Sequence, residues 1–412
     1  MNVALNTYSS AKTIVLFILL TALVVGLSLL SNRLWGGKPE GVPERKELVI
    51  DAEMTVGEFG QANGLPNSVL KGIFGVQVRS DLDKKLSEYG TPDQIKSLVT
   101  RKLALAVEGA TKNWVKIALK FTLWFTFLIT VFIVLRRRGR TPGLRKWLLF
   151  IAVLTFGVIM GSDPSPMGTV KDAIHLYGYT GALFPPRMTA LAVFLVIVFL
   201  ANKYICAWGC QVGVLQDLIF RLNRTDKGKA TVGRQLKVPF ALTNTVRVAF
   251  LGVFTAITFA WGADIIESVD PFKIYKPAFL GFAGAVFVGL LLITSLFIYR
   301  PWCHFLCPFG LVGWLVEKIS RVRISVNYET CIACQNCAVA CPSTVMGAIL
   351  RRDKKTIPDC FACYTCRDVC PTNSISFSTR KRVLPPPGHF EKKRRPQVGA
   401  EESTAQSQKG NG

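Results

Sequence analysis

Histidine is scarce in this chain of 412 residues, which contains three, and 26 acidic residues stand against 50 basic ones. His175 falls in a predicted loop and His389 in a polar tail, which excludes a haem held by two histidines between membrane helices. No Cys-x-x-Cys-His sequence occurs, which excludes an attached c-type haem. Neither a glycine-rich dinucleotide fingerprint nor a P-loop is present, so these nucleotide sites are excluded too.

Charge is scarce in six apolar stretches, and half of all residues are hydrophobic. Most of these stretches approach the roughly 20 residues that a helix needs to cross a bilayer. We therefore predict an all-α polytopic membrane protein with about six transmembrane helices. The first stretch follows Lys12 and lacks a small-x-small cleavage site, so we expect an uncleaved anchor rather than a signal peptide. The stretches lie near residues 13–30, 115–135, 147–160, 188–206, 246–262 and 279–299.

The net charge of +24 is unevenly distributed. Basic clusters at 136–146 and 221–237 follow the second and fourth stretches, and the short loops at the opposite helix ends carry few basic residues. This positive-inside pattern predicts a bacterial-type inner membrane protein whose N-terminus and C-terminal region are cytoplasmic. Residues 34–112 then lie outside. The pattern favours a lipid bilayer as partner and argues against nucleic-acid binding.

Five regions follow from these patterns. Thr55 and Glu58 have capping-box spacing, and Thr91-Pro92 is typical of a helix start, so the outer segment should be a small helical domain with an interaction role. The tail is rich in proline and basic residues and should be disordered. The predicted regions are an anchor helix (1–33), the extracytoplasmic domain (34–112), the transmembrane core (113–322), a ferredoxin domain (323–379) and the tail (380–412).

The transmembrane core repeats itself. An Asp-Pro loop occurs at Asp163 and again at Asp270, and each is followed by an apolar stretch and a Cys-x3-Cys pair. This order predicts an internal duplication whose halves run in the same direction, with the repeat axis along the membrane normal. Each pair should open a short amphipathic helix at the inner surface, and if the pair itself is helical, its two cysteines share one face.

Two identical runs of Cys-x2-Cys-x2-Cys-x3-Cys-Pro give the most specific signal in the chain. This spacing is typical of a ferredoxin domain with two [4Fe–4S] clusters, in which the fourth cysteine of each run ligates the other cluster. The domain should be cytoplasmic and of α+β class. The first predicted ligand set is Cys331, Cys334, Cys337 and Cys370. The second predicted ligand set is Cys360, Cys363, Cys366 and Cys341.

The two Cys-x3-Cys pairs leave several interpretations open. Small buried cysteines can pack helix ends, whereas four thiols brought together could bind a metal or another cluster, or act as redox-active pairs. Pro308 follows the second pair, whereas Gln211 follows the first, so the two pairs differ in detail. His304 is a candidate ligand or proton partner for its neighbouring thiols. The four cysteines are Cys206, Cys210, Cys303 and Cys307.

With these motifs, residues 120–380 resemble the membrane-bound polyferredoxins of the NapH, NosR and CcoG type. The resemblance implies electron transfer between cytoplasmic clusters and a quinone pool or a redox partner protein, in a respiratory chain. In its CcoG branch it implies copper or thiol handling during maturation, and a redox-sensing regulator is a third alternative. The outer segment lacks the flavin-attachment threonine motif that a NosR-like protein would carry.

A quinol site would need groups that accept protons. Acidic residues and one histidine are predicted at the outer face, and Asp163, Asp270 and His175 are the candidates that we single out. Asp-Pro at a helix boundary is also ordinary turn chemistry. The predicted outer group comprises Asp163, Asp172, His175, Asp264, Glu267 and Asp270.

Overall fold

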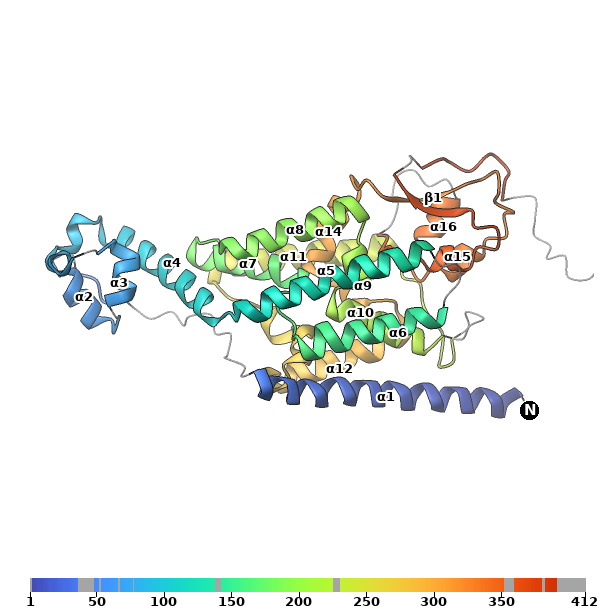
Figure 1. Cartoon of the computed structure of the whole chain (residues 1–412), viewed down its shortest axis with the longest axis horizontal. Helices are drawn as coiled ribbons and strands as arrows, with labels where there is room; N and C mark the ends of the chain where they lie inside the picture. Colours follow the sequence, from blue (N-terminus) through green and yellow to red (C-terminus); the bar gives the residue numbers. More distant parts are fainter. Residues whose placement is uncertain are drawn as a thin grey trace, which may run out of the picture.

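The computed structural model of the chain describes residues 2–35, 48–51, 53–65, 67–76, 78–137, 142–224, 230–351, 359–379 and 382–390. The protein is mostly helical, as predicted. A helical bundle occupies the middle of an elongated molecule. A small helical domain lies at one end, and a two-stranded sheet with short helices lies at the other (Figure 1).

All six predicted apolar stretches are helical in the bundle. Within the described residues, three helices are long and apolar enough to cross a membrane, and the six-span count stays a prediction. These three are α1 (Asn2–Trp35), α5 (Trp114–Arg137) and α11 (Phe240–Trp261). The shorter ones are α6 (Pro142–Ala152), which continues as the π-helical η3 (Val153–Ile159), α8 (Pro185–Ala201) and α12 (Phe282–Phe297).

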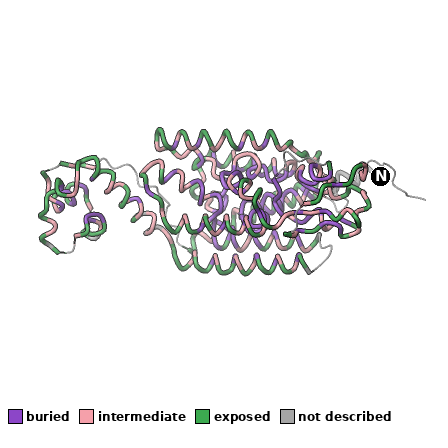
Figure 2. Tube along the Cα trace, turned by 90° about the horizontal axis from the view of Figure 1, so that it is seen from above, coloured by how far each residue is buried: buried purple, intermediate pink, exposed green. Residues whose placement is uncertain are grey.

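The core of the bundle is built around short helices. Figure 2 shows buried residues in the middle of the molecule and exposed ones on the outward faces of the long helices. In α10 every residue from Gln211 to Phe220 is buried, so this helix is not the amphipathic surface helix that the sequence predicts. The other short helices are α7 (Pro166–Thr180), α9 (Tyr204–Trp208), α10 (Gln211–Leu222), α13 (Pro301–Phe305) and α14 (Pro308–Glu317).

Helix ends in the bundle follow local rules. Pro166 occupies the first turn of α7, where its missing N–H costs nothing, and Ser165 caps that turn by accepting a bond from the Gly168 amide at 3.0 Å. Gly181 ends α7 and Gly262 ends α11 in the left-handed conformation, at φ 66° and 67°. A side chain at either position would be strained, which fixes where these helices turn.

The segment that the sequence predicts to lie outside forms its own small core from Val56, Phe59, Leu70, Leu86 and Val99, among others. Helices α2 and α4 each begin with a complete capping box. In each, the side chain of the N-cap threonine and the side chain three residues later bond each other's backbone amides. The elements are α2 (Val56–Ala62), α3 (Asn67–Phe74), the 3₁₀ turns η1 (Arg79–Asp83) and η2 (Leu86–Glu88), and α4 (Pro92–Thr111).

The C-terminal domain is α+β, as its cysteine motifs predict. Strands β1 (Arg323–Val326) and β2 (Ile375–Ser378) pair antiparallel, with Ile324 opposite Phe377. Its helices are α15 (Asn336–Ala340), α16 (Val345–Leu350) and α17 (Thr365–Asp368). Of the predicted tail, only residues 382–390 are described. The remaining 3₁₀ turns, before α12, are η4 (Glu267–Val269), η5 (Pro271–Tyr275) and η6 (Pro277–Phe279).

We expect the two ends of the bundle to lie on opposite sides of the membrane, because basic clusters gather at one end only. Alkaline phosphatase fused after residue 112 should be active, and a green fluorescent protein fused after residue 412 should fluoresce. The same two reporters exchanged between these positions serve as controls and should be silent. An active phosphatase at the C-terminus would contradict the topology.

Candidate functional site

Two cavities in the C-terminal domain are each bordered by four cysteines, three from one motif and one from the other. Cavity A, as we name it, is lined by Cys331, Cys334, Cys337 and Cys370. Cavity B is lined by Cys341, Cys360, Cys363 and Cys366. The fold therefore brings together the same two sets of four that the spacing predicts as ligand sets, including the exchange of the fourth cysteine.

The two cysteine loops are wound alike. Ala333 and Gln335 in the first loop have φ of 57°, and Ala362 and Tyr364 at the matching positions of the second have φ of 49° and 61°. Such left-handed residues in a loop turn successive backbone N–H groups toward one concave side, a geometry that suits anions and iron–sulfur clusters. Four thiols and inward amides in each cavity fit a [4Fe–4S] cluster.

The surroundings of the thiols support metal binding. Burial raises the pKa of Cys360 and Cys366 well above the ordinary value, so the thiolate forms there only with a cationic partner such as iron. At Cys370 burial acts in the same direction, but bonds from Thr372 and Ser374 outweigh it and lower the pKa. Among the described residues, no three metal-binding side chains lie close enough to hold a single ion.

Cavities A and B differ in exposure. Around cavity A, Cys334 is exposed, and Ile332 and Val339 expose 52% and 69% of their surface. Around cavity B, Phe361 and Tyr364 are buried, and Tyr364 stacks on Phe377 with ring centroids 4.1 Å apart. Cavity B therefore lies against the bundle, and cavity A lies toward solvent.

The two Cys-x3-Cys pairs are buried in the bundle and have the same backbone geometry. In each pair the first cysteine lies in a one-turn helix and the second is the N-cap of the next helix. Neither pair is therefore one continuous helix, which is the condition for a shared helical face. The backbone is extended at Cys210 (φ −70°, ψ 119°) and at Cys307 (φ −67°, ψ 118°). Pro308 imposes this extended conformation on the residue before it, Cys307. Cys210 adopts the same conformation although Gln211, rather than a proline, follows it.

A glycine three residues after each pair allows this packing. A Cβ on Gly213 would meet the Cys206 carbonyl oxygen at 3.0 Å, and one on Gly310 would meet the Cys303 carbonyl oxygen at 2.7 Å. The four thiols are mutually close enough to interact electrostatically, across the two halves of the bundle. We call Cys206, Cys210, Cys303 and Cys307 the cysteine quartet.

Buried charges tie the quartet to cavity B. Arg300 donates to the Cys206 carbonyl, to the Ala207 carbonyl at 2.9 Å and to Asp217 at 2.8 Å. Arg247 donates to the Cys303 carbonyl at 3.3 Å and to Asp359 at 2.8 Å. Asp359 directly precedes Cys360 in the sequence.

Lys203 completes this charge network from the other half of the bundle. Its ammonium group bonds Asp359 and the Gly310 carbonyl, the latter at 3.2 Å. No motif in the sequence marks Lys203, Arg247 or Asp359 as part of the site. One signal was available, because Lys203 and Arg300 each stand three residues before a cysteine pair.

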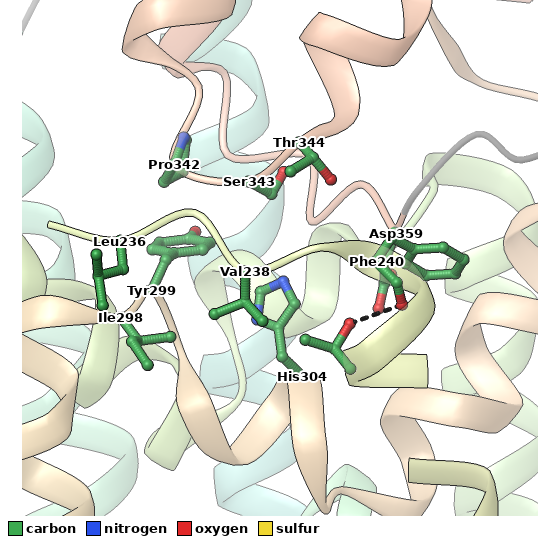
Figure 3. Close-up of a pocket in the computed structure, with 11 residues that line it drawn as sticks. Leu236, Val238, Phe240, Ile298, Tyr299, His304, Pro342, Ser343, Thr344 and Asp359 are labelled. Atoms are coloured by element: carbon green, nitrogen blue, oxygen red, sulfur yellow. Dashed lines mark hydrogen bonds between the residues drawn. The ribbon is translucent and has the colours of Figure 1, made fainter. Parts of the chain in front are cut away.

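His304 lies between the bundle and the loop that carries Ser343 and Thr344 (Figure 3). Its ring centroid is 4.9 Å from that of Phe361, and its Nδ1 is 3.1 Å from the Arg300 carbonyl oxygen. Burial lowers its pKa to about 4, so the imidazole is neutral at neutral pH. His304 therefore borders the junction with cavity B, rather than the thiols that the sequence suggested.

The outer group surrounds a buried lysine. The Lys171 ammonium lies 2.9 Å from Glu267, 3.0 Å from Asp264, 3.4 Å from Asp172 and 3.9 Å from Asp270. Two candidates lie outside this cluster. Asp163 pairs with Lys276 at 2.7 Å, and His175 Nε2 is 3.2 Å from the Gly262 carbonyl oxygen.

The carboxylates of this cluster differ in pKa. Burial raises the pKa of Asp270 to about 7. Burial acts in the same direction at Asp172, but Arg187 and Lys171 outweigh it and lower the pKa. Asp270 can therefore bind and release a proton near neutral pH, whereas Asp172 stays ionised.

A cavity of about 270 Å³ lies between α5, α7 and α8, near this cluster. Trp114, Ile117, Phe121 and Phe184 give it apolar walls, and Asp163, Asp172 and Arg187 are among its polar groups. Such a largely apolar pocket with a few convergent polar groups is the usual form of a small-molecule site. We call it the outer pocket.

The comparison with known protein families matches segments of the helical bundle. A family described as a 4Fe-4S binding domain matches residues 183–229 and again 280–327, and each match contains one Cys-x3-Cys pair. YccM of Escherichia coli (strain K12), named as an electron transport protein, is 30% identical over 221 residues, which are 50% of this chain and 56% of that protein.

Two further relatives match a smaller part of the chain. The methylamine utilization ferredoxin-type protein MauN of Methylobacillus flagellatus is 26% identical over 39% of this chain and 58% of its own length. Protein NirI of Paracoccus denitrificans is 32% identical over 29% of this chain and 18% of its own length. The chain thus spans little more than half the length of the first relatives. No solved structure matches it. Together with the two sets of four cysteines, these matches show that the chain is similar to ferredoxin-type electron transport proteins.

Proposed function

We propose that the chain passes electrons between a quinone bound in the outer pocket and two [4Fe–4S] clusters held in cavities A and B. The observation that carries the proposal is the pair of cavities lined by four cysteines each, with buried cations and thiols between them and the outer pocket. Lys120 donates to the Gly161 carbonyl at 2.6 Å and to the Asp163 carbonyl at 2.9 Å, next to the outer pocket. The same ammonium interacts electrostatically with Cys210 of the quartet.

The second cysteine pair provides the contact toward cavity B. Cys303 interacts electrostatically with Asp359, which precedes the cavity B ligand Cys360. The quartet therefore stands between the outer pocket and cavity B, as a metal site or a pair of redox-active thiols. We interpret the two halves as a duplication that supplies one cysteine pair each, and their matching backbone and repeated family match support this interpretation.

Exposure gives the order of the two clusters. Cavity B lies against the bundle and cavity A opens toward solvent, so a cytoplasmic redox partner protein would exchange electrons at cavity A. Ile332 and Val339 offer exposed apolar surface beside Cys334. Lys237 donates to the Val339 carbonyl at 3.0 Å, which places a positive charge next to this surface and suits an acidic partner.

The chain's own residues would handle the protons. When bound, each [4Fe–4S] cluster supplies one-electron redox chemistry. Oxidation of one quinol releases two electrons and two protons, and reduction of the quinone takes up the same. Asp172 lines the outer pocket and contacts Lys171, which also contacts Asp270. We assign Asp270 as a proton acceptor and Glu267, half-exposed, as the link to water.

The crossed ligand sets predict a specific loss of signal. Cys370→Ser should give the same electron paramagnetic resonance spectrum as Cys334→Ser, because both remove the cluster of cavity A. Cys341→Ser, the matched control, should resemble Cys363→Ser instead. Wild-type ferredoxin cavities should contribute about eight irons per chain. A Cys370→Ser spectrum that resembles Cys363→Ser would overturn the crossed assignment.

Filling the outer pocket should weaken quinol binding. Ala190→Phe places a ring in this cavity, and we expect KM for decylubiquinol to rise about tenfold, a loss of about 1.4 kcal/mol. Val196→Phe on the exposed face of α8 is the matched control and should change nothing. Cluster reduction by decylubiquinol, followed by absorbance, gives the rates. Equal KM in both variants would place the quinone site elsewhere.

The raised pKa of Asp270 predicts a pH dependence. Below about pH 7 this carboxyl is already protonated and cannot accept a proton, so quinol oxidation should slow as pH falls through 7. In Asp270→Asn we expect the step near pH 7 to disappear. Glu267→Gln should slow quinol oxidation at every pH but keep the step, because Lys171 and Lys273 outweigh burial and lower the pKa of Glu267. A step unchanged in Asp270→Asn would exclude this residue.

A further inference from the structure

We infer that residues 382–390 form a strap that closes one side of cavity A and is part of its cluster site. The inference rests on the proposed function, because it concerns the cluster that we place in cavity A. The strap belongs to the tail that the sequence predicts to be disordered, yet it packs on the C-terminal domain. Phe390, at its end, lines cavity A beside the four cysteines and packs against the hydrophobic core.

Contacts at both ends hold the strap on the domain. At its start, the Arg382 Nε donates to the Ile324 carbonyl of β1 at 3.1 Å. At its end, the rings of His389 and Phe390 meet Tyr328 edge to face, with centroids 5.6 Å and 6.3 Å from it. Aromatic pairs in this orientation stabilise a contact beyond the area that they bury. The strap is therefore anchored next to the first cysteine loop.

The local sequence gives the strap its shape. Residues 385–387 are three consecutive prolines, and each ring fixes φ at about −65°, which makes this stretch stiff. Gly388 then turns the chain at φ 70°, a left-handed conformation in which a side chain would be strained. The His389 N–H closes this turn by donating to the Pro386 carbonyl at 3.2 Å. The turn brings the rings of His389 and Phe390 back onto the domain.

Tyr328 connects the strap to the thiols. It interacts electrostatically with Cys331 and Cys337 of cavity A. Its hydroxyl oxygen and the Nε2 of His389 are buried without a hydrogen-bond partner in the part of the chain that the structure describes. A buried hydroxyl of this kind, beside two predicted ligands, suits donation to the sulfur atoms of a cluster.

The strap leaves one side of cavity A open. Cys334 is exposed, whereas Cys331 is only partly exposed. The exposed apolar side chains of Ile332 and Val339 lie beside this open side. A redox partner protein can therefore approach the cluster at Cys334, while the strap keeps water and small molecules away from the side that faces Tyr328.

Covering the cluster also affects its reduction potential. A reduced cluster carries one more negative charge than an oxidised cluster, and water stabilises that charge better than an apolar wall does. Solvent exposure is accordingly one of the features that set the potentials of iron–sulfur clusters. The strap therefore holds the potential of the cavity A cluster below the value that a fully exposed cluster would have.

Iron release tests whether Phe390 closes cavity A. Full-length protein, purified without oxygen and containing about eight irons per chain, is mixed with bathophenanthroline disulfonate, and release is followed by absorbance. In Phe390→Ala we expect the cavity A iron to leave about tenfold faster than in the wild type, because the ring no longer covers it. Phe390→Tyr keeps a ring and should restore the wild-type rate. Val383→Ala, at a strap residue that is 64% exposed, is the matched control and should change nothing.

Two truncations test the strap as a whole. A chain that ends after residue 381 loses the strap, and a chain that ends after residue 390 keeps it. The shorter chain should release iron faster, and its cavity A cluster should titrate at a more positive potential. The longer chain should match the wild type. Electron paramagnetic resonance follows the titration, the signal absent from Cys334→Ser marks cavity A, and the cavity B signal is the internal reference.

Equal release rates and equal potentials in the two truncations would overturn the inference. Loss of both cluster signals in Phe390→Ala would also overturn it, because the strap would then support folding rather than cover one cluster. The point variants decide the matter if the shorter truncation does not fold.

Failure of the proposed function would look different. If about eight irons bind and Phe390→Ala releases iron faster, but decylubiquinol reduces no cluster, the quinone proposal fails and the strap stands. If decylubiquinol reduces both clusters and Phe390→Ala releases iron at the wild-type rate, the proposed function stands and the strap fails.

Discussion

The buried carboxylate of Asp359 is the contact on which the arrangement of cavity B and the cysteine quartet depends. It bonds Lys203 from the first half of the bundle and Arg247 from the second, and the three side chains are at most 2% exposed. Its position directly before Cys360 means that the ion pairs also fix the start of the second cysteine loop. Breaking such a buried pair typically costs about 3–5 kcal/mol, because one charge is left without compensation. The network therefore holds cavity B and the quartet at one fixed separation.

A second constraint is the close approach of backbone within each cysteine pair. Gly213 and Gly310 leave no room for a Cβ, and the guanidinium groups of Arg300 and Arg247 contact the carbonyls that these glycines face. Each half of the bundle thus contributes the same unit: a basic side chain, a one-turn helix, an extended cysteine and a glycine. Equivalent units facing each other explain why four thiols from distant parts of the sequence meet in one buried region.

At the end of the bundle near Lys171, proton affinity is set by competition between burial and ion pairing. Lys171 gathers four carboxylates, and their other surroundings give them different proton affinities. Asp172 stays ionised because Arg187 also faces it, whereas Asp270 is dominated by burial. Neighbouring groups that differ in this way suit stepwise proton transfer next to an apolar pocket.

The sequence by itself determined the helical class, the two sets of four cysteines and the small outer helices, because these depend on spacing within a short segment. Capping boxes at Thr55 and Thr91 and the two cysteine motifs act over fewer than a dozen residues. Only the tertiary structure decided the rest. Burial of α10, the meeting of the quartet and the partners of Asp359 depend on contacts between residues far apart in the chain. The sequence shows that Lys203 and Arg247 are basic, but a pairing energy arises only when packing removes water from around both partners.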